Sequence, residues 1–198
     1  MNPTTCGNAA IASGIGGALV GVLTIFYPPA VPDDVWSYPF PGGVLLLVSL
    51  ALALLHLLTA VGFYGVLLAD PHRGSRPAAI AVWVAIVAFV ALGMAEVLSG
   101  LLGEAAADGS RADDLGMLFG LGSLLSAVGS IVAGIIIARA GRWSGLGRWI
   151  LVGSGVLMIV VVTPAIVSGV LWASQVALIV WSLTFVPLGR AIAGTRQV

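Results

Sequence analysis

Apolar residues dominate the chain in long runs that are separated by short polar connections. Each run reaches the ~18 residues that mark a candidate transmembrane helix, since about 20 residues cross a ~30 Å hydrocarbon core. The stretch from Trp149 to Gly189 is too long for one crossing, so we divide it at a tight turn near Ser168 and Gly169. The pattern predicts an all-α integral membrane protein, one polytopic domain over residues 1–198, with six spans at residues 8–27, 43–69, 78–103, 115–138, 149–167 and 170–189.

Composition excludes an ordinary soluble domain. Apolar residues make up 60% of the chain and charged residues only 8%, and the mean hydropathy is +1.14. A soluble domain carries about a quarter charged residues, which this chain cannot supply for a polar surface. The first ten residues contain no Lys or Arg, so they lack the basic segment of a cleavable signal and we keep the first run as a span. The formal net charge of zero gives no reason to expect a nucleic-acid partner.

The charged residues separate by connection. With six spans and both termini on one side, the connections at 70–77 and 139–148 and the C-terminal tail share a face. That face holds every arginine of the chain except Arg111, and its single acid is Asp70. The opposite face holds the acids Asp33, Asp34, Glu104, Asp108, Asp113 and Asp114. By the positive-inside rule we expect a multi-pass cell-membrane protein with the arginine-rich loops and both termini in the cytoplasm.

Small residues at a spacing of four favour close helix packing, because lipid gives helices no hydrophobic reason to associate. Two such rows are present, one in the first span and one in the fourth: Ser13, Gly17 and Gly21, and Gly122, Ser126, Ser130 and Gly134. The contacts lie either within one molecule or between copies in a homo-oligomer. Thr163-Pro164 predicts a kink or local opening in the fifth span, since proline removes a backbone hydrogen bond, and Pro187 is expected to terminate the last helix.

Glu96 is the most informative polar residue, because it stands alone in the apolar stretch ALGMAEVLSG. It lies roughly 10 Å from the outer end of its span at 1.5 Å per residue. Gly93, Ser99 and Gly100 share its helix face and leave room for a partner or ligand. An acid facing lipid would cost at least ~2.5 kcal/mol, so Glu96 should face the bundle interior. It is either a proton donor, proton carrier or cation ligand, or else a structural group that hydrogen-bonds a neighbouring helix or reaches toward the outer interface.

His56 is the second candidate and lies near the membrane midplane, about 20 Å from the start of its span. Such a histidine relays a proton, binds a ligand or hydrogen-bonds a neighbouring helix. Its estimated depth differs from that of Glu96 by roughly 10 Å, so the sequence allows but does not require contact between them. Since His72 in an inner turn is the only other histidine, a membrane dihaem protein is not expected.

Aromatic residues fall into two groups by depth. Those near the span ends are expected to anchor in the headgroup region, where indole rings are favoured; they are Trp36, Tyr38, Phe40, Trp143 and Trp149. Deeper rings either line a substrate pocket or fill the core; they are Phe63, Trp83, Phe89 and Trp181.

Three functions remain open from the sequence. The first is a small enzyme acting on a lipid-soluble, isoprenoid-type substrate, in which protonated Glu96 starts a terpene-type cyclisation and the deeper rings stabilise a cation. The second is a proton- or cation-coupled transporter, and the third a non-catalytic accessory subunit. We expect no cofactor and no metal site, because no P-loop, GxSxG, HExxH or CxxC motif is present and Cys6 is isolated. The acid pairs Asp33-Asp34 and Asp113-Asp114 could bind a divalent cation, but acidic outer loops also follow from topology alone.

Overall fold

A computed structural model of the chain describes residues 1–103, 105 and 107–195. Six helical segments are long and apolar enough to cross a membrane, as the hydrophobic pattern predicts. The first four are single helices, α1 (Pro3–Phe26), α2 (Gly42–Ala69), α3 (Arg76–Leu102) and α4 (Ser110–Ala140). The fifth span comprises α5 (Gly145–Leu157), a π-helical turn (Met158–Val162) and α6 (Thr163–Val167), and the sixth comprises α7 (Leu171–Leu183) and α8 (Phe185–Ala193).

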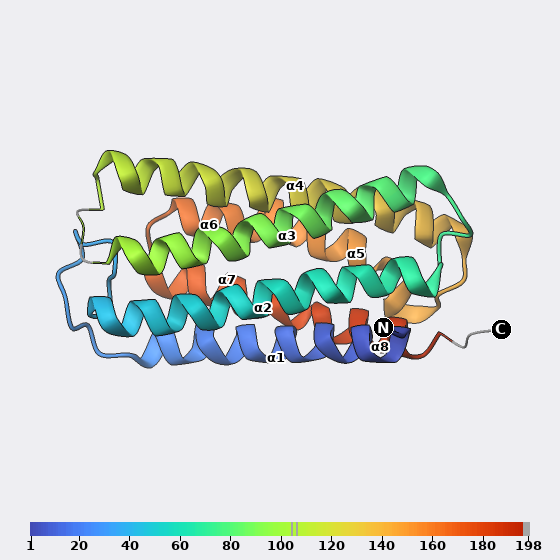
Figure 1. The fold of residues 1–198 in the computed structure, drawn as a ribbon, viewed down its shortest axis with the longest axis horizontal. Helices are drawn as coiled ribbons and strands as arrows, with labels where there is room; N and C mark the ends of the chain where they lie inside the picture. The colour runs from blue at the N-terminus through green and yellow to red at the C-terminus, as the bar shows by residue number, and fades with distance from the viewer. Residues whose placement is uncertain (104, 106, 196–198) are drawn as a thin grey trace.

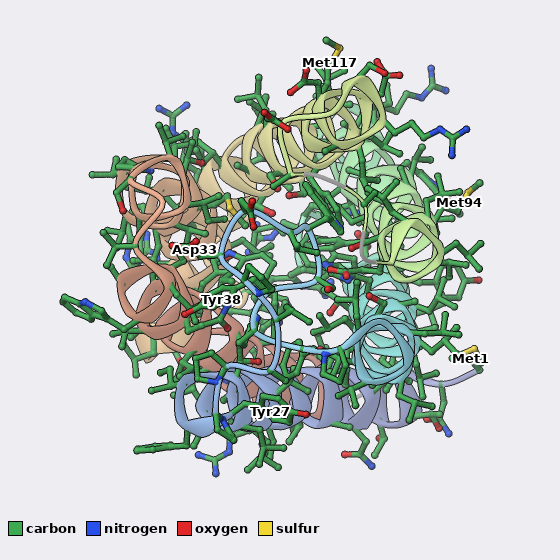
Figure 2. All side chains as sticks on the ribbon, turned by 90° about the vertical axis from the view of Figure 1, so that its left-hand side faces the viewer. Met1, Tyr27, Asp33, Tyr38, Met94 and Met117 are labelled. Atoms are coloured by element: carbon green, nitrogen blue, oxygen red, sulfur yellow. The ribbon has the colours of Figure 1, made fainter. Side chains whose placement is uncertain are left out.

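The six spans form a closed ring of antiparallel neighbours. Each packs against the next along the chain, and the sixth span closes the ring on α1 (Figure 1). Large apolar side chains such as Leu47, Leu54 and Val87 cover the outside, whereas the interior holds aromatic and small residues. Viewed along the ring axis, the connection between α1 and α2 lies across the end of the bundle, with Asp33 and Tyr38 over its centre (Figure 2).

The two ends of the bundle differ in charge. We name one the arginine end, formed by the turns after α2 and α4 and by both chain termini, and the other the acidic end, formed by the connections after α1, α3 and α6 (Figure 1). The arginine end carries the described residues Arg73, Arg76, Arg139, Arg142, Arg148 and Arg190. Glu104 and Arg196, which belong to the same charge pattern, lie outside the described residues.

Helix α4 begins earlier than the hydrophobic pattern predicts. Its first turn contains Asp113, which the sequence analysis placed in a loop. A carboxylate near a helix N-terminus is stabilised by the helix dipole, so an acidic segment can extend the helix beyond the apolar run. Similarly, α1 begins at Pro3, where Asn2 caps the helix by accepting a hydrogen bond from the backbone N–H of Thr5 at 2.8 Å.

The last two spans are interrupted. The π-helical turn ends at Val162. The next residue, Thr163, lies immediately before Pro164, and its hydroxyl donates to the carbonyl of Met158 at 2.9 Å. This opening confirms the irregularity predicted at Thr163-Pro164. The turn at Ser168 and Gly169 is also confirmed, with Gly169 at a φ of 70°. The prediction for Pro187 is wrong: helix α8 continues to Ala193, and the break falls upstream at Thr184, next to the carbonyl of Leu183 that the proline ring would crowd.

Both small-residue rows pack within the molecule. A methyl group added at Gly17 in α1 would lie 2.7 Å from the hydroxyl oxygen of Ser182, so this row brings α1 against α7. A methyl group added at Gly134 in α4 would lie 2.6 Å from the backbone nitrogen of Val152 in α5. Such close backbone approach is the usual basis of helix association in lipid.

Candidate functional site

A cavity of about 260 Å³ lies inside the acidic half of the ring. We call it the Glu96 cavity, because Glu96 of α3 and His56 of α2 both line it. Helices α1 and α7 form the other walls, and Tyr38, Pro39 and Phe40 of the connection after α1 lie against it. The cavity is slightly smaller than the ~300–1,000 Å³ of typical ligand pockets, so it would hold a small molecule or one end of a longer one.

Glu96 and His56 meet in this cavity. The Nδ1 atom of His56 lies 4.0 Å from Oε1 of Glu96, and the two side chains are 17% and 13% exposed. Side chains tilt toward the N-terminus of their own helix. Since α2 and α3 are antiparallel, His56 reaches toward the acidic end and Glu96 toward the arginine end, which closes the difference in depth between their backbones. The structure therefore joins the two residues that the sequence analysis treated separately.

Gly93 allows this approach. A methyl group added at Gly93 would lie 3.3 Å from the carbonyl oxygen of Ala53 and 3.6 Å from Cβ of His56. The small residue that precedes Glu96 by one helical turn thus accommodates the backbone of α2 beside His56. The space that the sequence analysis expected next to Glu96 is therefore filled by α2, which carries His56.

The pair is only partly hydrogen-bonded. Nδ1 of His56 lies 3.0 Å from the carbonyl oxygen of Leu52, so the tautomer that satisfies this carbonyl carries its proton on Nδ1. The carboxyl of Glu96 makes no hydrogen bond with any other described residue. Glu96 therefore keeps its hydrogen-bonding capacity for a molecule in the cavity.

Hydroxyl groups on the cavity wall are mostly paired with protein atoms. Thr59 donates to the hydroxyl of Ser13 at 2.9 Å, which connects α2 to α1. Ser99, one turn after Glu96, accepts a hydrogen bond from the indole nitrogen of Trp36 at 2.9 Å. The amide of Gln175 in α7 also lines the cavity and has no partner among the residues that the structure describes. Gln175 is a polar lining residue that sequence reasoning missed, because no pattern marks it in an apolar span.

Aromatic rings form the deeper wall. Trp181 and Phe185 line the cavity with their ring centroids 4.8 Å apart, and Phe63 and Phe89 pack behind them with centroids 5.0 Å apart. Three of the four rings proposed from the sequence therefore belong to one cluster beside the Glu96–His56 pair. Trp83 does not: it is 49% exposed on the outside of the ring and contacts Tyr64.

The interfacial anchoring expected for the aromatic residues near the span ends is wrong for two of them. Phe40 is buried against the Glu96 cavity and contacts Tyr27, because the connection after α1 folds over the end of the bundle. Trp143 is also buried, and its indole donates to Thr195 at 3.2 Å. Trp149 is more than half exposed beside Arg148, as an interfacial residue would be.

The acidic connections lie side by side but do not form a metal site in the described part of the chain. The N–H of Trp36 donates to the carbonyl of Ala105, and that of Ala107 donates to the carbonyl of Asp34, both at 2.9 Å. Within the described ranges, no three His, Cys, Asp or Glu side chains are placed to hold a metal ion. The acid pairs carry no further evidence for a cation.

Comparison with known proteins gives no assignment: no protein-family model, curated protein or solved structure matches the chain. Fold and site therefore define its class on their own. The chain is an all-helical protein with six helices able to span a membrane, and an acid and an imidazole share a cavity inside the ring.

Proposed function

We propose that this protein is a small intramembrane enzyme that performs acid–base chemistry on a lipid-soluble substrate of isoprenoid type. The observation that carries the proposal is the Glu96–His56 pair, 4.0 Å apart in a cavity with an aromatic wall. Ionisable groups within a membrane are costly and are functional by default. By the positive-inside rule the arginine end and both termini face the cytoplasm, so the cavity lies in the half of the bundle within the outer leaflet.

The proposed reaction is a proton-initiated isomerisation or cyclisation. Protonated Glu96 donates its proton to an alkene carbon, and the resulting carbocation is attacked by a second double bond of the same molecule, which forms a new carbon–carbon bond. The Nδ1–H of His56 shifts from the carbonyl of Leu52 toward the new carboxylate and stabilises it, as catalytic hydrogen bonds often tighten only during reaction. The product cation then returns a proton to Glu96, so substrate and product are isomers and the enzyme is regenerated.

The aromatic wall supports this chemistry. The rings of Trp181 and Phe185 line the cavity, and ring faces attract a cation by about 0.5–2 kcal/mol. The sheltered cavity also limits capture of the cation by water, which would give an alcohol instead of an alkene.

A carrier is the second candidate, and the interrupted helices favour it. The break at Thr184 separates Trp181 from Phe185, both of which line the cavity, and the fifth span contains a π-helical turn. Discontinuous helices are typical of substrate sites in transporters. In that function Glu96 would carry the coupled proton.

One variant tests both functions. Glu96→Gln keeps the size of the side chain but removes the proton donor, and loss of a general acid typically lowers turnover by 10²–10⁴-fold. The matched control is Asp113→Asn, which removes an exposed carboxylate that does not line the cavity. Purified protein is incubated with prenyl alkenes and epoxides, and products are analysed by mass spectrometry; pH-dependent solute flux is measured in vesicles that contain the same preparation.

The enzyme proposal requires turnover that is lost in Glu96→Gln and retained in Asp113→Asn. Flux with the same pattern and no product would support the carrier. Equal behaviour of both variants in both assays, with unchanged helical content, would exclude Glu96 from function.

A further inference from the structure

A second cavity of about 780 Å³ opens at the arginine end, opposite the Glu96 cavity. Its walls come from the start of α1, the end of α2, the turn after α4 and the end of α8. Arg142, Ser144, Arg190 and Thr195 are among its polar lining residues, and Leu68 and Pro71 are among its apolar ones. We propose that this cavity, which we call the arginine cavity, binds an anionic phosphate group, with the headgroup of an acidic membrane lipid as the favoured source.

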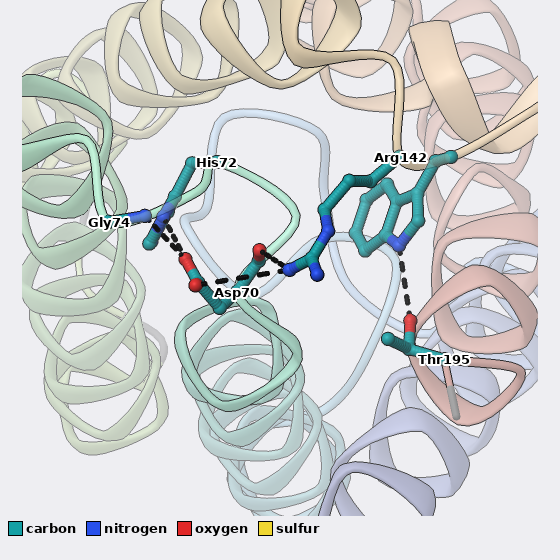
Figure 3. A network of polar contacts seen from close by, with 6 residues as sticks. Asp70, His72, Gly74, Arg142 and Thr195 are labelled. Atoms are coloured by element: carbon teal, nitrogen blue, oxygen red, sulfur yellow. Dashed lines mark hydrogen bonds and ion pairs between the residues drawn. The ribbon is translucent and has the colours of Figure 1, made fainter. Parts of the chain in front are cut away.

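Charge at this end favours an anion. The guanidinium of Arg190 has no ion pair or side-chain hydrogen bond with any residue that the structure describes. Among the described residues, Asp70 is the only acidic side chain at the arginine end. It is already engaged, because its Oδ1 accepts the N–H of Gly74 at 2.8 Å and lies 2.6 Å from Nδ1 of His72 (Figure 3). Asp70 therefore stabilises the turn between α2 and α3, and its single negative charge cannot balance the positive charges of the arginines at this end.

Arg142 is fixed at the cavity wall. Its NH1 donates to the backbone carbonyl of Asp70 at 2.9 Å and lies 3.9 Å from the Asp70 carboxylate (Figure 3). A guanidinium has five N–H donors, so this single bond leaves others for a ligand. Arginine binds phosphate through paired donors, and a side chain that is already oriented loses less entropy on binding.

The turn after α4 adds neutral donors. Ser144 is the N-cap residue of α5, and its side chain makes no capping hydrogen bond in the structure. The first N–H groups of a helix have no partner within the helix, and the helix dipole makes this end attractive to anions. Ser144 itself lines the arginine cavity, so its hydroxyl and the start of α5 lie beside the arginines.

The shape of the cavity favours a lipid over a free ion. A volume of about 780 Å³ is far larger than phosphate requires, and apolar side chains line the cavity together with the arginines. A lipid would place its phosphate on the arginines and its glycerol region against Leu68 and Pro71. Basic pockets between transmembrane helices are known to hold acidic headgroups in this way.

The test uses the full chain in neutral detergent and records its thermal unfolding midpoint during titration. The three probes are dioctanoyl phosphatidylglycerol, dioctanoyl phosphatidylcholine and inorganic phosphate. A ligand that binds only the folded state raises the midpoint, and the rise grows with the logarithm of the ratio of ligand concentration to Kd. We expect phosphatidylglycerol to act at concentrations about tenfold or more below phosphatidylcholine.

Arg190→Gln should weaken the effect of phosphatidylglycerol at least tenfold, since it removes a charged hydrogen-bond donor. Arg190→Lys, which keeps the charge, should retain part of the effect, and Arg139→Gln, an exposed residue outside the cavity at the same end, should retain all of it. Stabilisation by inorganic phosphate at the same concentrations would identify a soluble phosphate as the source. Equal effects of the two lipids, or equal responses of Arg190→Gln and Arg139→Gln, would overturn the proposal.

Discussion

Replacing Gly129 of α4 with alanine tests the helix contact that positions α3, the helix carrying Glu96. A methyl group added at Gly129 would lie 2.6 Å from the carbonyl oxygen of Ala81 and 3.1 Å from the backbone nitrogen of Ala85. Both obstacles are backbone atoms of α3, so no side-chain rotation relieves them. Since carbon contacts settle near ~3.5–4.0 Å, the two helices must separate by about 1 Å.

The expected loss of stability is worked out against a matched control, Gly120→Ala, in the same helix. A methyl group added at Gly120 would meet nothing within 4 Å. Both substitutions gain helix propensity, up to about 1 kcal/mol, and this gain cancels when the variants are compared. The remaining difference is the cost of overpacking, about 1–3 kcal/mol. We therefore expect Gly129→Ala to be less stable than Gly120→Ala by this amount.

The assay is unfolding of the full chain in mixed micelles by a denaturing detergent, followed by the helical circular dichroism signal. Gly120→Ala should unfold at or above the midpoint of the native chain, and Gly129→Ala clearly below it. Coincident midpoints with equal slopes would refute the reasoning, because they would show that α3 and α4 are not in backbone contact at Gly129.

Two further predictions concern the site. Trp181→Leu should lower Glu96-dependent turnover or flux at least several-fold, whereas Trp83→Leu should leave it unchanged, because only Trp181 lines the cavity; kinetic assay of both variants checks this. Trp36→Phe removes the hydrogen bond to Ser99 and should destabilise the covering connection by about 1 kcal/mol, which faster protease cleavage within residues 28–41 would reveal. Unchanged cleavage would indicate that the connection is held by other contacts.

The spans were predictable because hydrophobicity alone determines which segments enter a membrane. The turn at Gly169 and the opening at Thr163-Pro164 were also predictable, since each depends on local backbone chemistry. The position of the break in the sixth span was not. The ring of Pro187 acts on the preceding turn, so the irregularity appears at Thr184 while the helix continues past the proline.

The faces of the helices could not be predicted from hydropathy. Lipid and bundle interior are both apolar, so α3 presents apolar residues on all sides and the pattern does not distinguish Phe89, which is buried, from Trp83, which is exposed. The same limit applies to two glycines that lie two residues apart in α4. Gly122 packs against Leu92 of α3, whereas Gly120 has nothing within 4 Å of the position that a Cβ would take. Only packing against α3 and α5 selects the inward face.

The Glu96–His56 pair combines a predictable part with an unpredictable one. An acid in a lipid-spanning helix had to face the interior, and the small residues around it indicated where another helix could approach. Backbone rise then suggested a separation of roughly 10 Å. That estimate omitted the opposite tilt of side chains on antiparallel helices, which brings Nδ1 of His56 to 4.0 Å from Oε1 of Glu96. Gly93 makes this arrangement possible. Because it has no side chain, α2 can approach α3 closely enough for the carboxyl of Glu96 and the imidazole of His56 to share one cavity.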